Sequence, residues 1–515
     1  MHTRPLSARI VIVAATLALV LPLSGCVSSF LPKPASSTST PTTEKVAADL
    51  EPFYRQVLTW KSCENGDFQC ATAKAPMDWK NPATKSIDLA LIRTTASGTK
   101  LGSLLVNPGG PGASGYDFIR DSLTYAVDSK LQQNYDIVGF DPRGVNKSSA
   151  VKCYQDSAAM DAFLFNVSPN PFGSDGWIAD QKASNLKFGQ ACLKFTGDLL
   201  GFIDTVSAAR DLDLLRAVLG DKKLNYLGYS YGTLLGATYA DLYPQKTGRL
   251  VLDGALDPTT SSFDVGATQA KGFESALRAY LADCKSGKDC PFTGSVDTAM
   301  TTTIRSLLDS LDASPLLAKD GRELSSSVMF NAIIAPLYNR TTWPDLSQLF
   351  TSAMKGNADL AFQLADNYYG RNPDGSYKDN STEAFIAINC LDYATTSTST
   401  EALRADAATL KQLAPVLGPQ LSYDTSCAAW PFKSTRDRVA LTAAGSAPIL
   451  VVGTTNDPAT PYVWAKALAK ELRNGHLVTY RGEGHTAYNK SNSCVQAAVD
   501  DFFVNGTVPS KDPKC

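Results

Sequence analysis

Apolar residues recur along the chain with two periods, and their order predicts strands alternating with helices. Residues 86–97 (SIDLALIRTTAS) alternate apolar and polar positions, as a half-buried strand does, whereas 102–106 and 135–140 are short apolar runs typical of buried strands. A helical period follows at 204–220. The residues on its apolar face are Val206, Ala209, Leu212, Leu215 and Leu219.

The same alternation continues further along the chain, with helices predicted at 233–243 and 462–474 and a last helix at 494–506. The predicted strands around these helices are 224–228, 248–254, 448–453 and 476–482. Strands joined by helices are typical of a parallel sheet covered on both faces. We therefore expect an α/β fold.

This rhythm is interrupted between residues 258 and 430. Helical segments such as 295–311 and 381–394 follow one another there without intervening strands, and several carry cysteines. We interpret 258–430 as an inserted, mostly helical cap, and 46–257 together with 431–515 as the α/β domain.

The first 26 residues differ from the rest of the chain. Arg4 and Arg9 precede an apolar run, and the segment ends in LSGC, with the cysteine at position 26. This pattern resembles a bacterial lipoprotein signal peptide with its lipobox, in which Cys26 is lipidated. A retained transmembrane anchor and an ordinary secretory signal are the alternatives, although the apolar run is short for a span. Each of the three readings predicts export.

With Cys26 lipidated, we expect the protein on the outer face of the bacterial cytoplasmic membrane, either anchored there or shed. Residues 27–45 are rich in Ser, Thr and Pro and are predicted to form a flexible tether.

Charge and cysteine content limit which partners, metals and cellular compartments we expect for this protein. The 515 residues include 48 basic and 50 acidic side chains without basic runs, so we expect no nucleic-acid partner. Eleven cysteines less Cys26 leave ten, an even number suited to disulfides in an oxidising compartment. None has the spacing of a zinc site with nearby histidines, and we predict no metal and no cofactor. Pairing of neighbours suggests Cys63–Cys70, Cys153–Cys192, Cys284–Cys290, Cys390–Cys427 and Cys494–Cys515.

A candidate nucleophile lies in the segment GYSYG, residues 228–232, between a predicted strand and a predicted helix. A sharp turn in this context presents Ser230 above the sheet. The alternative is a serine in a tight turn without a catalytic role. A nucleophilic serine needs a general base, and His2, His476 and His485 are the three histidines. Only His485 follows a strand at the carboxyl edge of the predicted sheet.

An acid that orients the base should lie at the same edge. Asp457 follows the predicted strand 448–453, and Asp253 and Asp257, after another strand, are its rivals. The order Ser230, Asp457, His485 is that of α/β-hydrolases, so we favour Asp457.

The glycine-rich loop NPGGPG, residues 107–112, also follows a predicted strand. Its backbone N–H groups could stabilise an oxyanion together with the N–H of Tyr231. Gly110 is the first candidate and Gly109 the second. The loop lacks the pattern of a phosphate-binding loop.

Taken together, PGGPG at 108–112, DPRG at 141–144, GYSYGT, TNDPATP and GEGHTAY resemble the exported tripeptidyl aminopeptidases of streptomycetes. They are also similar to the mycobacterial lipoprotein carboxylesterase A. Both belong to the prolyl-aminopeptidase-like branch of the α/β-hydrolases. The resemblance spans nearly the whole mature chain and implies an α/β-hydrolase fold with a helical cap. It also implies serine-type release of short N-terminal peptides or residues from peptides with a free amino terminus.

Two departures weigh against a strict proline preference: Asn107 stands where the branch usually has histidine, and tyrosines flank Ser230. An aminopeptidase also needs an acid for the substrate ammonium. Glu383 and Asp392 are hypotheses for this role, with solvated surface carboxylates as the alternative.

Two other functions stay open at this stage. A carboxylesterase would use the same triad, and cap shape decides between esters and peptides. A binding lipoprotein without activity would have a broken triad or no oxyanion hole.

Overall fold

The computed structural model describes residues 36–394 and 398–515, which contain one mixed sheet of ten strands in the order β1-β2-β3-β4-β6-β5-β7-β8-β11-β12. From β6 to β12 neighbouring strands are parallel, and from β1 to β6 they are antiparallel. The strands are β1 Ser36–Thr38, β2 Thr59–Cys63, β3 Phe68–Pro76, β4 Ser86–Thr94, β5 Gly102–Asn107, β6 Tyr135–Phe140, β7 Leu224–Tyr229, β8 Thr247–Asp253, β11 Ile449–Asn456 and β12 Gly475–Glu483.

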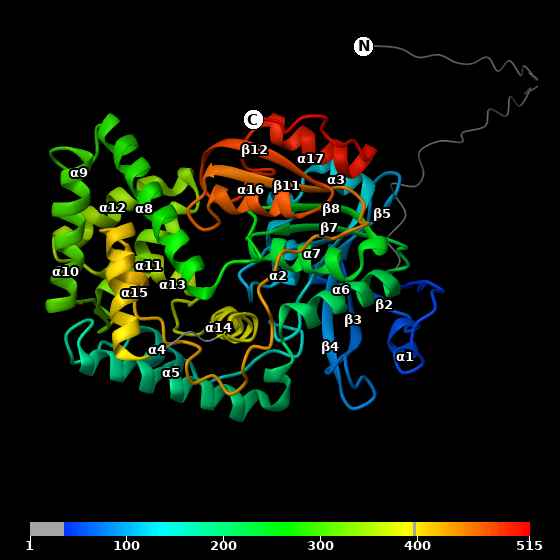
Figure 1. Cartoon of the computed structure of the whole chain (residues 1–515), viewed down its shortest axis with the longest axis horizontal. Helices are drawn as coiled ribbons and strands as arrows, with labels where there is room; N and C mark the ends of the chain where they lie inside the picture. The colour runs from blue at the N-terminus through cyan, green and yellow to red at the C-terminus, as the bar shows by residue number, and fades with distance from the viewer. Residues whose placement is uncertain (1–35, 395–397) are drawn as a thin grey trace, which may run out of the picture. The chain divides into compact units, whose positions relative to one another are not determined.

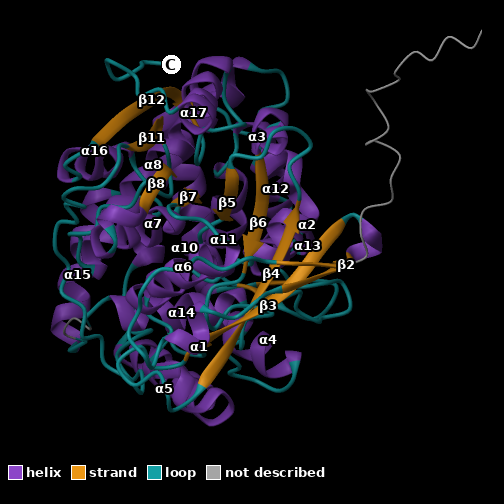
Figure 2. Cartoon of the chain, turned by 90° about the vertical axis from the view of Figure 1, so that its right-hand side faces the viewer, coloured by secondary structure: helices purple, strands orange, loops and turns teal. Residues whose placement is uncertain are grey.

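Helices cover both faces of this sheet (Figure 2). Alternate residues of one strand join different cores: Leu104 and Val106 of β5 pack with α2, α3 and α17, whereas Leu105 packs with α6, α7 and α16. These helices are α2 Gly115–Ala126, α3 Ser129–Asn134, α6 Thr205–Leu219, α7 Tyr231–Leu242, α16 Tyr462–Glu471 and α17 Ser493–Asn505. The predicted α/β fold is confirmed.

A second, helical region has a hydrophobic core of its own, to which Leu277, Ile333 and Phe350 belong. Figure 1 shows most of its helices gathered on one side, with α14 between them and the sheet. The helices of this stretch of chain are α8 Ser262–Ser286, α9 Val296–Thr298, α10 Arg305–Ala313, α11 Ser326–Leu337, α12 Trp343–Met354, α13 Asp359–Tyr369, α14 Ser381–Asp392 and α15 Thr400–Leu413. The buried apolar side chains of α14 belong to the core that the sheet shares with α6 and α7. A two-stranded sheet, β9 Leu316–Leu317 with β10 Glu323–Leu324, lies in the same stretch of chain.

The segment of chain between β6 and α6 packs against these helices. It forms α4 (Ser157–Phe165) and α5 (Asp175–Thr196). Phe165 belongs to the core of the helical region, and Asp161 accepts two hydrogen bonds of 2.8 Å from the Arg371 guanidinium.

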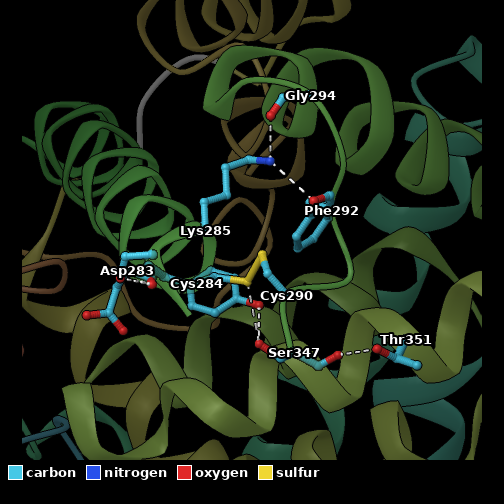
Figure 3. The surroundings of a disulfide bond; sticks show 10 residues. Asp283, Cys284, Lys285, Cys290, Phe292, Gly294, Ser347 and Thr351 are labelled. Carbon is cyan, nitrogen blue, oxygen red and sulfur yellow. Dashed lines mark hydrogen bonds between the residues drawn. A yellow bond between two sulfur atoms is a disulfide. The ribbon is translucent and has the colours of Figure 1, made fainter. Parts of the chain in front are cut away.

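All five predicted disulfides are present. Cys284 and Cys290 close a short loop after α8, where the Lys285 ammonium donates to the carbonyls of Gly294 and Phe292 at 2.7 and 3.2 Å (Figure 3). The bridge and the lysine thus hold this loop, whose Phe292 is buried in the core of the helical region.

The structure corrects part of the predicted tether. Residues 36–38 form β1, which pairs with β2, and the Glu44 carboxylate lies 2.5 Å from the buried guanidinium of Arg216. The prediction of a flexible segment over 27–45 is therefore wrong from residue 36 onward, because backbone pairing and this ion pair compensate for the lack of apolar side chains. The predicted signal segment and Cys26 lie outside the described residues. Within them, no helix is long and apolar enough to cross a membrane.

The C-terminal residues lie beside the edge strand β12. The Thr479 N–H donates to the Pro513 carbonyl, and the Cys515 N–H donates to the Thr479 carbonyl. The Cys494–Cys515 disulfide links this tail to α17.

Candidate active site

Ser230 occupies the turn between β7 and α7, as the sequence predicts. Its φ of 55° and ψ of −125° place it in a strained conformation that non-glycine residues rarely adopt. At Gly228, before the turn, a Cβ would lie 2.4 Å from the Gly232 carbonyl oxygen, so a larger residue would not fit. The side chain of Ser230 is partly exposed. This is the geometry of a nucleophile elbow.

His485 and Asp457 meet at the ends of β12 and β11. The His485 Nδ1 lies 2.9 and 3.0 Å from the two carboxylate oxygens of Asp457. Because a carboxylate only accepts hydrogen bonds, Nδ1 carries the proton and Nε2 is left to accept one. His476 belongs to the first residues of β12, at the opposite end from His485.

The Asp457 carboxylate is nearly fully buried, at 2% exposure. It accepts the backbone N–H groups of Ala459, Thr460 and Thr486 at 2.8–3.2 Å. These bonds fix the carboxylate in the loop from which it meets His485.

Asp253, the rival acid, has a different task. Its buried carboxylate accepts the N–H groups of Ala487 and Tyr488 at 2.7–3.0 Å and so holds the loop that follows His485. Burial raises the pKa of Asp253. Asp257, the other rival, accepts from Thr259 within its own turn.

Asp253 and Gly254, at the end of β8, contact the turn that contains Ser230 and the loop that contains His485. The Ser230 N–H donates to the Asp253 carbonyl at 2.9 Å. A Cβ at the next residue, Gly254, would lie 3.2 Å from His485 Cε1, the ring carbon between the two nitrogens. Ser230 and His485 therefore contact adjacent residues of one strand end.

The glycine-rich loop after β5 lies against the nucleophile turn. A Cβ at Gly109 would be 2.8 Å from the Ser230 Cβ and 3.0 Å from the Tyr231 nitrogen. The Gly109 N–H donates to Asn107 Oδ1 at 2.9 Å, which commits that donor. This favours Gly110 over Gly109 as the loop's oxyanion donor. Tyr231 begins α7, where N–H groups lack helical partners.

Two residues that contact the histidine were not predicted from the sequence. The Thr460 hydroxyl donates to Asp457 Oδ2 at 2.9 Å and lies 3.1 Å from His485 Nδ1. The carbonyl of Tyr338, just after α11, accepts the backbone N–H of His485 at 2.8 Å. The centre of the Tyr338 ring lies 5.3 Å from the centre of the imidazole, in an edge-on contact. Thr460 could have been noticed from its place three residues after Asp457, but nothing in the sequence relates Tyr338 to His485.

The hypothesis that Glu383 or Asp392 binds a substrate ammonium is wrong. The Glu383 carboxylate is 9% exposed and accepts the Cys153 N–H at 2.9 Å. Asp392 is 1% exposed and accepts the N–H and the hydroxyl of Thr205. Both carboxylates hold elements together, so they are not solvated surface groups either.

A cavity of about 1210 Å³ lies elsewhere, between the Cys284–Cys290 loop and α12. Tyr280, Arg340 and Trp343 are among its lining residues, whereas Ser230, Asp457 and His485 are not. Among the described residues, no three His, Cys, Asp or Glu side chains are grouped as metal ligands would be.

The chain is similar to known proteins over most of its length. The chain is 34% identical over 490 residues to the serine protease Hip1 of Mycobacterium tuberculosis, covering 90% of this chain and 92% of the relative. It is 35% identical over 517 residues to carboxylesterase B of the same organism, covering 96% and 98%. The tripeptidyl aminopeptidase of Streptomyces lividans is 28% identical over 478 residues, covering 90% and 87%.

A family model described as TAP-like protein matches residues 414–515, the part of the chain that contains Asp457 and His485. Among solved structures, the proline iminopeptidase of Mycobacterium smegmatis aligns with 84% of this chain and 98% of its own at 13% identity, with a TM-score of 0.36.

Proposed function

The chain belongs to the family of α/β-hydrolases that includes the serine protease Hip1, carboxylesterase B and the tripeptidyl aminopeptidases, and on this basis we propose that it is an exported serine peptidase. It is a serine hydrolase by family. The proposed reaction releases short peptides or single residues from the free amino terminus of a peptide.

In the proposed mechanism Ser230 Oγ attacks the scissile carbonyl while His485 Nε2 takes its proton. Asp457 keeps the imidazole in the required orientation. The N–H groups of Gly110 and Tyr231 stabilise the oxyanion. His485 then protonates the leaving amine, and a water molecule activated by the same imidazole hydrolyses the acyl-enzyme.

The observation that carries this proposal is the convergence of two loops on the end of β8. The Asp253 carbonyl holds the backbone of Ser230, and the neighbouring Gly254 contacts the ring of His485. The same ring has its Nδ1 on the buried Asp457 carboxylate, and in the proposed mechanism its second nitrogen, Nε2, takes the serine proton.

A carboxylesterase is the second candidate, supported by the 35% identity to carboxylesterase B over 96% of the chain. Esters and peptides pass through the same tetrahedral intermediate, so the triad serves both.

The experiment compares three substrates: a tripeptide nitroanilide with a free amino terminus, its acetylated form, and a short-chain nitrophenyl ester. We expect cleavage of the free peptide, little of the acetylated one, and none by Ser230→Ala. Ester turnover without cleavage of the free peptide would establish the esterase. Absence of turnover, together with no labelling by an organophosphonate, would indicate a binding protein.

We also propose that Cys26 carries a lipid that anchors the protein at the outer face of the cytoplasmic membrane. The signal-like sequence before Cys26 and the five disulfides, which suit an oxidising compartment, support this. Metabolic labelling with a radioactive fatty acid should mark the wild type and not Cys26→Ala. Equal labelling of both would refute lipidation at this residue.

A further inference from the structure

We infer that α14 braces both donors of the oxyanion hole, and that Asp392 is a positioning residue that acts on Tyr231 through Thr205. This inference rests on the proposed function, because it concerns the hole assigned there. Sequence position places α14 in the cap, where it would be expected to shape the substrate site. Its contacts instead connect it to the two segments that supply the oxyanion donors.

The first end of α14 is packed on the glycine-rich loop. A Cβ at Gly112 would lie 2.6 Å from the Ser381 carbonyl oxygen and 2.8 Å from the Phe385 nitrogen. Asn380, which precedes the helix, donates from Nδ2 to the Gly144 and Val151 carbonyls at 2.9 and 2.8 Å. The start of α14 is therefore fixed to the turn after β6, and the loop that contains Gly110 has the helix backbone as its support.

The other end of α14 connects to the nucleophile turn through a chain of buried groups. Asp392 accepts the Thr205 N–H at 3.0 Å and also the Thr205 hydroxyl. The Thr205 hydroxyl lies 2.5 Å from the hydroxyl of Tyr231. All three residues are at most 4% exposed. Because the threonine gives its one proton to the carboxylate, Tyr231 must donate to Thr205.

Burial raises the pKa of Asp392, and the Arg436 guanidinium and the Thr205 hydrogen bonds oppose this by stabilising the charged carboxylate. Burial raises the pKa of Tyr231 well above its usual value, so the phenol keeps the proton that it donates. Arg436 lies 3.4 Å from the Asp392 carboxylate and donates to the Thr238 hydroxyl of α7 at 2.9 Å. The buried Asp392 carboxylate thus has a cationic partner, Arg436, which is itself hydrogen-bonded to α7.

A fixed side chain on Tyr231 orients its backbone. Tyr231 is the first residue of α7, and its N–H has no partner within the helix. Anchoring the phenol restricts rotation of this first turn and keeps the N–H directed at the oxyanion. A small misplacement of such a donor is costly, since about 1 Å can reduce a rate roughly 100-fold.

Tyr229 provides a matched control. It flanks Ser230 on the other side, is 2% exposed, and donates its hydroxyl to the Ala126 carbonyl at 2.6 Å. Tyr229→Phe and Tyr231→Phe each remove one buried tyrosine hydrogen bond beside the nucleophile. Only Tyr231→Phe breaks the connection to Asp392.

The experiment measures hydrolysis of p-nitrophenyl butyrate and inhibition by an alkyl trifluoromethyl ketone, whose adduct with the serine places an oxyanion in the hole. We expect Tyr231→Phe and Asp392→Asn to lower kcat by about 10- to 100-fold with KM unchanged, and to weaken the ketone by the same factor. Tyr229→Phe should lower the melting temperature as Tyr231→Phe does, while its kcat stays that of the wild type.

Equal kcat values for Tyr229→Phe and Tyr231→Phe would overturn the inference, even if Asp392→Asn fails to fold. Ser230→Ala separates this from a failure of the proposed function. If that variant keeps its esterase activity, the assigned active site is wrong. If it is inactive while Tyr231→Phe is unaffected, only the bracing role is wrong.

Discussion

The carboxyl edge of the sheet and the helical region divide the work of this site. The sheet edge supplies every group assigned to the chemistry: the serine after β7, the acid after β11, the histidine after β12 and the glycine loop after β5. The helical region supplies contacts that hold those groups. Tyr338 touches His485, and α14 lies between the glycine loop and the Thr205–Tyr231 pair.

In both regions the role of an acid follows from the groups that its carboxylate meets. Asp457 extends from a strand end and meets an imidazole, whereas Glu383 and Asp392 extend from a helix and meet backbone N–H groups or a hydroxyl. An acidic residue near a site in sequence is therefore a candidate for chemistry only if its carboxylate is free to meet a reacting group.

The largest effect separates two acids within the sheet region. Asp457→Asn should reduce kcat by about 10⁴-fold, because the amide can present its N–H to Nδ1 and favour the wrong tautomer. Asp253→Asn should act mainly on stability, since its carboxylate holds the Ala487 and Tyr488 N–H groups and not the ring. Steady-state kinetics and thermal melts of both variants measure this. If folded Asp253→Asn loses more kcat than Asp457→Asn, then Asp253 is the acid that orients His485 and Asp457 is the structural one.

A moderate effect tests whether the helical region reaches the histidine. Tyr338→Leu should remove the ring contact on His485 and lower kcat about fivefold, corresponding to an aromatic contact of about 1 kcal/mol. Tyr338→Phe should keep the wild-type rate, because the hydroxyl pairs with Tyr368 and not with the imidazole. If both variants lose the same activity, the ring contact is not what matters.

The smallest effect on the rate, none, is expected for a carboxylate packed within the sheet region, where stability changes instead. Burial raises the pKa of Asp500, on α17, from an ordinary 3.8 to about 7, and Tyr488 donates to it at 2.8 Å. Between these values the folded state binds a proton that the unfolded state does not. Stability should therefore be full below pH 4 and fall as the pH rises to 7, by at most about 1.4 kcal/mol per pH unit.

Urea unfolding at several pH values measures this slope. Asp500→Asn should remove it, and Asp501→Asn, at a half-exposed neighbour that pairs with Lys130, should leave it intact. An unchanged slope in Asp500→Asn would show that other groups dominate.

The sequence is most informative where one period governs a segment. Helix 204–220 was predicted from its apolar face and is α6, Thr205–Leu219. The strand ends followed from the apolar runs, and with them the positions of Ser230, Asp457 and His485, because parallel strands place their carboxyl ends at one edge. The five disulfides could be predicted because each joins two cysteines that are neighbours in the sequence.

Contacts between distant segments could not be predicted in this way. Residues 36–45 lack apolar side chains, and their order depends on β2 and Arg216, which the local sequence does not reveal. The roles of Tyr338 and Asp392 depend on how the helical region sits on the sheet. No periodicity within either region specifies that packing.

The tail beside β12 has a consequence for solubility. A parallel sheet leaves its last strand with unpaired N–H and C=O groups, which can recruit a strand from another molecule. Here Pro513 and Cys515 satisfy Thr479 from within the chain, and the disulfide to Cys494 keeps them there. Reduction of that bond would allow the tail to leave and would expose the Thr479 N–H and C=O, so we expect the reduced protein to self-associate more readily than the oxidised one.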